Sequence, residues 1–176
     1  MDNRDYAIIG LLLVIIAMLS YGVINAYNDS QPEVFEFSDY IVTAPAGSHY
    51  HNNSDNPVFY LSENEVYSMF AILKNDSFTV EEFDIMYNGL KNGSVSKSDF
   101  LNMMNSGPED NSSLVDVNVG DFRGEPEISM IVQNTQNQSR KGLIHFVKHN
   151  NDKVFMIAEE MDNPSATQMY NNLVLK

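Results

Sequence analysis

The chain has 176 residues, with 24 acidic against 10 basic side chains and a formal net charge of −14. Nucleic acids and anionic lipid surfaces are bound by clustered Lys and Arg, so this balance excludes both kinds of partner. The sequence contains no cysteine, which excludes disulfides, cysteine zinc sites, iron–sulfur ligation and thiol catalysis.

The first predicted element is an apolar helix at Tyr6–Tyr27, YAIIGLLLVIIAMLSYGVINAY. No charged residue lies between Asp5 and Asp29, and about 20 helical residues cross a hydrocarbon core roughly 30 Å thick. We therefore expect a single transmembrane helix over 6–27, preceded by a cytoplasmic N-terminus over 1–5. The polar residues 28–33 predict a short stalk, and 34–176 is long enough for one extracytoplasmic domain.

A cleaved signal peptide is the main alternative to this anchor. Signal peptides begin with basic residues and have an apolar core of about 7–15 residues, whereas this chain begins MDNRD. Cleavage after Ala26 would also place the bulky Ile24 where a small residue is preferred. A buried helix of a soluble domain would show a polar face, which Ile8–Leu19 lacks. The pattern favours an uncleaved anchor.

Basic residues near the anchor indicate its orientation. Arg4 precedes the helix, and the next basic residue is Lys74, far beyond the segment that determines topology. We expect the N-terminus inside and the C-terminal domain outside the cell membrane. Six Asn-x-Ser sequons follow the helix and are glycosylation candidates in an exported domain: Asn28, Asn52, Asn75, Asn92, Asn111 and Asn137. An Asn- and Ser-rich chain also produces such sequons by chance.

The first half of the domain predicts β-structure. Ser38-Asp39 separates the first two β-rich runs and indicates a tight hairpin, while the polar residues 48–57 indicate a loop. The expected strands are Val34–Phe37, Tyr40–Ala44, Val58–Leu61 and Val66–Leu73.

Two helices are expected next. Thr79 and Glu82 have the spacing of a capping box, and Ser96 and Asp99 repeat it. Asn92-Gly93 predicts the end of the first helix, so 80–106 should form a helical hairpin.

The last third returns to strands and ends in a helix. In the first of these strands, alternation predicts that Val115, Val117 and Val119 share one buried face. Asn163-Pro164 predicts the start of the final helix, with Met169, Tyr170 and Leu173 toward the core. The expected strands are Leu114–Phe122, Ile128–Val132, Gly142–Lys148 and Lys153–Glu159.

Two segments carry a family resemblance. FEFSDYIVTAPAG near the start and VFMIAEEMDNPSATQMYNNLVL at the end resemble the two ends of the PsbP/Mog1-like α+β sandwich. The resemblance implies an α+β fold, with an antiparallel sheet packed against a helical hairpin and a C-terminal helix. The anchor, the Asn-rich composition and the lack of Cys also resemble small archaeal surface proteins. Neither resemblance implies functional residues.

One metal-site candidate emerges from the predicted loop. His49 and His51 face the same side of an extended chain, and Asp55 lies nearby, so these three could bind a metal. Incidental histidines in a surface loop are the alternative. An EF-hand is excluded, because Glu82 as the twelfth ligand would place Ala71 in the first position.

No catalytic or cofactor-binding motif is present in the sequence. His145 and His149 share a strand face and are expected to be solvent-exposed, while Glu159 and Glu160 should point to opposite faces. Met103, Met104 and Met156 are expected to be core residues, with copper ligands as the alternative. We expect a binding or scaffolding module of the cell envelope, with a possible envelope protein as partner. A hydrolase-like envelope enzyme and a metal-dependent module remain open alternatives.

Overall fold

The computed structural model describes residues 31–51, 57–63, 66–74, 78–106, 112–135 and 141–176, which form an α+β fold in which every paired strand is antiparallel. The predicted anchor at Tyr6–Tyr27 lies outside these residues. Among the residues that are described, no helix has the length and apolar character needed to cross a membrane.

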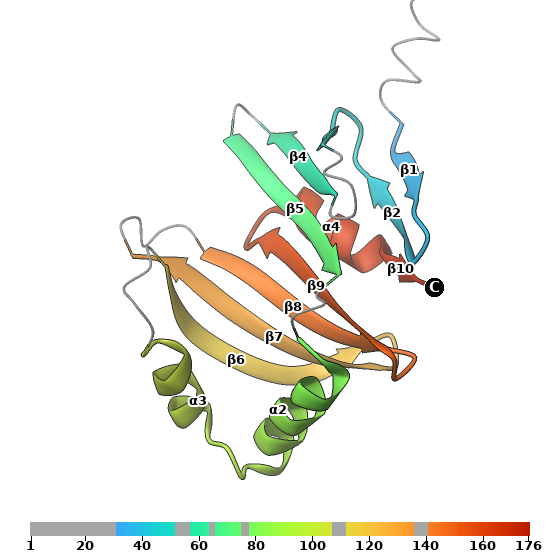
Figure 1. Cartoon of the computed structure of the whole chain (residues 1–176). Coiled ribbons are helices and arrows are strands. Elements are labelled where there is room, and N and C mark those ends of the chain that lie inside the picture. The colour runs from blue at the N-terminus through green and yellow to red at the C-terminus, as the bar shows by residue number, and fades with distance from the viewer. Residues whose placement is uncertain (1–30, 52–56, 64–65, 75–77, 107–111, 136–140) are drawn as a thin grey trace, which may run out of the picture.

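The larger sheet has seven strands in the order β3-β4-β5-β9-β8-β7-β6 (Figure 1). The last four strands of this sheet in sequence form two hairpins, β6-β7 and β8-β9, which are joined by pairing between β7 and β8. The strands are β3 (His49–His51), β4 (Val58–Glu63), β5 (Val66–Lys74), β6 (Ser112–Phe122), β7 (Glu125–Asn134), β8 (Lys141–His149) and β9 (Lys153–Glu160).

The prediction of a loop over 48–57 is wrong for its first residues, because His49–His51 forms the strand β3. His49 is opposite Tyr60 and His51 is opposite Val58 in the adjacent strand. Backbone pairing to β4 overrides the weak β-propensity of this polar segment.

A smaller sheet contains β1 (Glu33–Glu36), β2 (Tyr40–Ala44) and β10 (Val174–Leu175) in the order β1-β2-β10. The predicted hairpin at Ser38-Asp39 is confirmed, and the Phe37 amide donates to the Tyr40 carbonyl at 2.9 Å. The sequence analysis did not predict β10, a two-residue strand that pairs with β2 at the opposite edge.

The helical hairpin is confirmed as α2 (Val80–Asn92) and α3 (Lys97–Met104). The Thr79 amide donates to the Glu82 carboxylate at 2.8 Å, and the Glu82 amide donates to the Thr79 hydroxyl at 3.2 Å. Gly93 ends α2 in the left-handed conformation with φ of 76°. The third described helix, α4 (Pro164–Asn172), begins at the predicted Asn163 cap.

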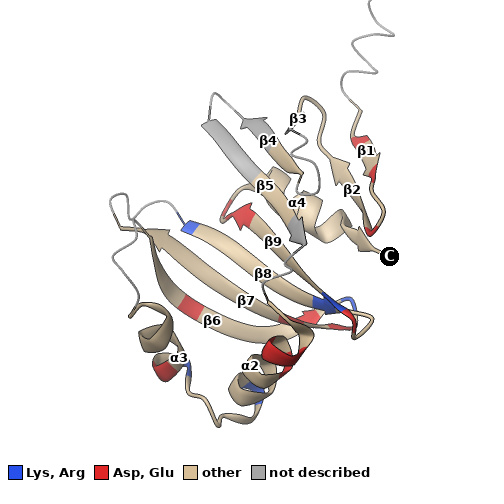
Figure 2. Cartoon of the chain, viewed as in Figure 1, with Lys and Arg blue, Asp and Glu red and all other residues tan. Residues whose placement is uncertain are grey.

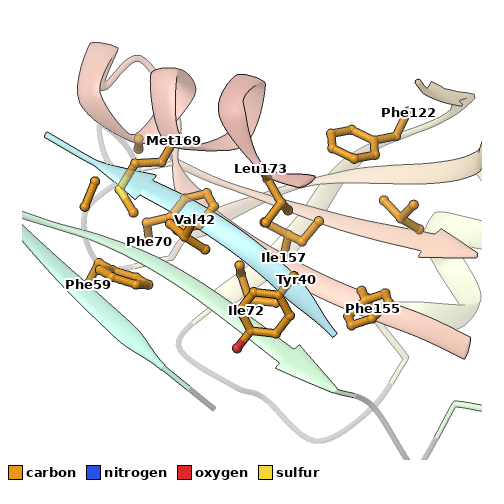
Figure 3. Close-up of a cluster of buried hydrophobic side chains, with 13 residues drawn as sticks. Tyr40, Val42, Phe59, Phe70, Ile72, Phe122, Phe155, Ile157, Met169 and Leu173 are labelled. Atoms are coloured by element: carbon orange, nitrogen blue, oxygen red, sulfur yellow. The ribbon is translucent and has the colours of Figure 1, made fainter. Parts of the chain in front are cut away.

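These helices lie on different sides of the seven-stranded sheet (Figure 1). The hairpin packs against β6 and β7, whereas α4 lies between β9 and β2. The core beneath α4 contains side chains from both sheets, among them Val42, Phe70, Ile157 and Leu173 (Figure 3). A second core beneath the hairpin contains Phe83, Phe100, Val117, Ile128, Met130 and Val154.

The predicted alternation along β6 is interrupted by a β-bulge between Leu114 and Asp116. An extra residue in one strand reverses the faces on either side of it. Leu114 therefore packs against the same core as Val117, and Val115, which was predicted to be buried, is 39% exposed.

Candidate functional site

The predicted metal-site residues are only partly within the described structure. His49 and His51 occupy β3, Asp55 lies outside the described residues, and the side chains of the two histidines are outside them as well. Within the described part of the chain, no group of three or more His, Asp or Glu side chains is arranged to hold a metal ion. The metal hypothesis for His49, His51 and Asp55 stays untested.

Of the six sequons, Asn92 lies within the described residues. It is exposed at the end of α2, and its side-chain oxygen accepts a hydrogen bond from the Ser94 amide at 2.9 Å. The other five acceptors lie outside the described residues: Asn28, Asn52, Asn75, Asn111 and Asn137.

The expectation that His145 and His149 are exposed is wrong. Their exposed fractions are 5% and 8%, because the His145 ring stacks on Tyr170 of α4 and the His149 ring lies near Phe155 of β9. The expectation that Met103 and Met104 are core residues is also wrong. They are 60% and 51% exposed on α3.

His145 is the centre of a buried polar cluster that also contains Glu127, Glu159 and Tyr170, called here the His145 cluster. Its Nδ1 atom lies 2.6 Å from Glu127 Oε1, and its Nε2 atom lies 3.2 Å from Glu159 Oε1. The Tyr170 hydroxyl donates to Glu127 Oε1 at 2.6 Å. Four elements therefore meet in one network, namely β7, β8, β9 and α4.

The strand register explains how the two glutamates reach one imidazole. His145 is directly opposite Ser129 of β7 and Ile157 of β9. Glu127 and Glu159 each lie two residues away from those positions, which makes them diagonal neighbours on the same sheet face. Long side chains bridge such diagonals, so the histidine is held from both sides.

The cluster favours the charged forms of His145 and Glu127 and the neutral form of Tyr170. Burial alone would lower the pKa of His145, but hydrogen bonds to Glu127 and Glu159 outweigh burial and raise it above its ordinary value of 6.5. Burial would raise the pKa of Glu127, but hydrogen bonds from His145 and Tyr170 outweigh it and lower that pKa. Burial, with the hydrogen bond to Glu127, raises the pKa of Tyr170.

This arrangement engages the ring nitrogens that acid–base catalysis by His145 would use. A general base must reach the proton it abstracts, and both ring nitrogens of His145 already contact carboxylates in a buried site. The two nitrogens point in opposite directions, so the glutamates and the histidine do not converge on a metal. The chemistry available to the cluster is proton binding and the cohesion of the elements around it.

A cleft of about 380 Å³ lies at the end of the seven-stranded sheet where β6 and β8 begin, and it shares Glu159 with the His145 cluster. We call it the sheet-end cleft. Its apolar side chains are Val132, Leu143, Ile144 and Ala158; Ser112, Asn134, Lys141, Gly142, Glu159 and Glu160 complete the lining.

The sheet-end cleft continues the sheet face that the helical hairpin covers. Ile144 is opposite Met130 in β7 and Ala158 in β9. Met130 belongs to the core beneath α2 and α3. Apolar side chains of this face thus extend past the helices into an open cleft. The ribbon colours in Figure 2 mark a basic residue at the start of β8 and acidic residues at the end of β9, which are Lys141, Glu159 and Glu160.

The sequence analysis did not predict either feature. It noted the shared face of His145 and His149, but bringing Glu127 and Glu159 to that face requires the register of three strands. The signal available in the sequence was one ionisable residue in each of three neighbouring strands, namely Glu127 in β7, His145 in β8 and Glu159 in β9. That signal becomes specific only when the strands are aligned.

Comparison with known proteins supports the fold. No family model matches the sequence, and no curated protein does either. The structure is similar to the solution structure of cyanobacterial PsbP (CyanoP) from Synechocystis sp. PCC 6803, with a TM-score of 0.51 and 12% identity. The match covers 84% of this chain and 94% of that one. The PsbP-like fold that the resemblance implies is therefore confirmed.

Proposed function

We propose that this protein is a single-pass membrane protein whose PsbP-like domain lies outside the cell membrane and binds another envelope protein. The membrane placement is supported by the uncharged segment Tyr6–Tyr27, the orientation by Arg4, and the outward domain by the sequons. The similar structure supplies the fold alone, because one fold carries many functions.

The sheet-end cleft is the observation on which the binding function rests. Exposed concave sites with apolar side chains and a few polar groups are typical of binding sites in proteins. Here Val132, Ile144 and Ala158 supply the apolar surface, with Lys141 and Glu160 beside it. A partner segment that presents an apolar side chain flanked by polar groups would complement this cleft.

The enzyme alternative has weaker support. The strongest acid–base group among the described residues is the buried histidine with two carboxylates, and both of its ring nitrogens already contact those carboxylates. A metal-dependent module likewise has no described ligand set.

Photo-crosslinking in intact cells tests the proposal. A photoreactive residue replaces Lys141 in the full-length chain, and the matched control replaces Ile85, which is 66% exposed on α2. We expect a discrete crosslinked protein from position 141 and not from position 85. Ile144→Glu should abolish that crosslink while leaving the folded domain intact by circular dichroism. Equal crosslinking from both positions, or none from position 141, would contradict a binding role for the cleft.

Asn92 offers a separate test of the outward placement. Its exposure and its hydrogen bond with the Ser94 amide leave the sequon accessible at the tip of the helical hairpin. In a host that glycosylates exported proteins, Ser94→Ala should remove one glycosidase-sensitive increment of mass, whereas Ser98→Ala should not. An unchanged mass in the Ser94 variant would argue against modification at this residue.

A further inference from the structure

The geometry points to the His145 cluster as a pH-sensitive contact that holds α4, and with it the smaller sheet, on the seven-stranded sheet. This inference is independent of the binding function proposed above. It rests on the position of α4, on the number of protons that His145 can donate, and on the surroundings of the two glutamates.

Helix α4 connects the two sheets. Met169 and Leu173 are fully buried in the core that also contains Val42 of the smaller sheet. The chain then continues directly into β10, where Val174 is opposite Ile41 of β2. A change in how α4 sits on the larger sheet is therefore transmitted to β2 by both packing and backbone pairing.

Tyr170 carries the contact between α4 and the cluster. Its hydroxyl donates to Glu127 Oε1 at 2.6 Å, and its ring stacks on His145 with centroids 4.1 Å apart. Arg123, in the turn between β6 and β7, donates to the carbonyl of Asn171 one residue later. Both contacts tie the C-terminal half of α4 to the β6–β9 part of the sheet.

The proton count makes this contact sensitive to pH. An imidazolium has two N–H donors, one for each glutamate, whereas a neutral imidazole has a single donor. Loss of the proton would therefore leave one nitrogen lone pair facing a carboxylate oxygen inside the protein. Glu159 would be left with the fewest hydrogen bonds, because its Oε2 atom has no hydrogen-bond partner among the described residues. An unpaired buried carboxylate is strongly destabilising.

Other charged and titratable groups lie on the elements packed around the cluster. Glu125 Oε1 lies 3.3 Å from His149 Nδ1, farther along β7 and β8, and Lys153 of β9 pairs with Asp39 at 2.5 Å. Tyr40 of β2 and Arg123 complete the set on the elements packed there. None of these lies between the two glutamates, so His145 is the group whose charge decides the cluster.

The direction of the effect follows from linkage. The pKa of His145 is raised in the folded protein, so its stabilising contribution is full below about pH 6.5 and is lost as the pH rises through the folded-state value. Glu127 has a lowered pKa, so its contribution is lost only in acid. The contact should be strongest in weakly acidic solution and should loosen as the pH rises through the folded-state pKa of His145.

NMR on the full-length chain in detergent micelles tests this inference. The nitrogen resonances of His145 report its protonation, and hydrogen-exchange protection factors report the opening of α4, after correction for the intrinsic pH dependence of exchange. We expect the pKa of His145 to lie above its ordinary value of 6.5. As it titrates, the amides of Met169 and Tyr170 should lose protection several-fold, while those of Phe83 in α2 should not.

The matched variants are His145→Gln and His149→Gln. The first should abolish the pH-dependent part of α4 protection, and the second should preserve it. The wild-type titration decides the question even where the first variant fails to fold. A His145 pKa that is not raised above its ordinary value would overturn the inference, as would α4 protection that does not change when His145 titrates.

Discussion

His145 and Tyr170 stack with their ring planes 21° from parallel, and both hydrogen-bond to the same oxygen, Glu127 Oε1. A strand and a helix that are distant in sequence are thus joined through one carboxylate oxygen. Two donors on one acceptor stabilise its negative charge and fix the direction from which each donor approaches. This relationship makes the energetic role of the Tyr170 hydroxyl measurable.

Tyr170→Phe removes the hydroxyl and keeps the ring that stacks on His145. We expect the free energy of unfolding to fall by about 1–3 kcal/mol, because a buried charged acceptor loses a donor. Tyr87→Phe is the matched control, since its hydroxyl makes a long 3.5 Å contact with the Gly120 carbonyl at the surface. That variant should change stability by less than about 0.5 kcal/mol. Equal losses in urea unfolding would contradict a specific role for Tyr170.

Glu127→Gln should change the acid side of the stability profile. The lowered pKa of Glu127 means that its ionised form stabilises the fold above about pH 4.5, and that this contribution is lost as the pH falls through the folded-state pKa. The glutamine lacks the charge, so the variant should be less stable than wild type at neutral pH. Because glutamine does not titrate, the variant should also lose less stability than wild type on acidification. Glu81→Gln, on the surface of α2, should keep the wild-type slope. Parallel profiles for Glu127→Gln and wild type would contradict the ionised state assigned here.

Substitutions at Phe83 and Ile85 test the buried and the exposed side of α2. Phe83 is fully buried beneath the hairpin, whereas Ile85 is 66% exposed. Phe83→Ala should cost about 3–5 kcal/mol, since it removes apolar contacts and leaves a cavity. Ile85→Ala should change the unfolding free energy by about 0.5 kcal/mol or less. A small effect at Phe83 would mean that α2 does not pack on the sheet as described.

Gly93 tests the end of α2. Its φ of 76° lies in the left-handed region, and a Cβ added there would meet no atom within 4 Å. Gly93→Ala should therefore lose about 1 kcal/mol through backbone strain alone. Gly93→Asn should lose less, because asparagine adopts this conformation more readily. Thermal unfolding that ranks alanine above asparagine would contradict this explanation.

The sequence predicted the elements whose signals are local. Thr79 with Glu82, and Asn163 before Pro164, indicate helix starts within a few residues, and these starts are confirmed. The segments that depend on pairing with distant strands, β3 and β10, were not predicted. The bulge at Leu114/Asp116 was missed for a similar reason, since a bulge is defined by the partner strand.

The His145 cluster was beyond sequence reasoning for a physical reason. An isolated histidine is an exposed residue by default, and its burial here is compensated by carboxylates from two neighbouring strands. Neither Glu127 nor Glu159 is near His145 in sequence, so the compensation becomes visible only with the register. The sheet-end cleft could not be predicted from the sequence either, because its shape depends on how far α2 and α3 extend over the sheet.

Protease treatment of intact cells tests most directly the claim that the domain lies outside the membrane. The full-length chain carries a C-terminal epitope after Lys176, and the membrane is either left sealed or opened with detergent. We expect the epitope to be removed in sealed cells, while an internal cytoplasmic marker survives until detergent is added. Survival of the epitope in sealed cells, with its loss only after detergent, would contradict the outward placement and the envelope partner that depends on it.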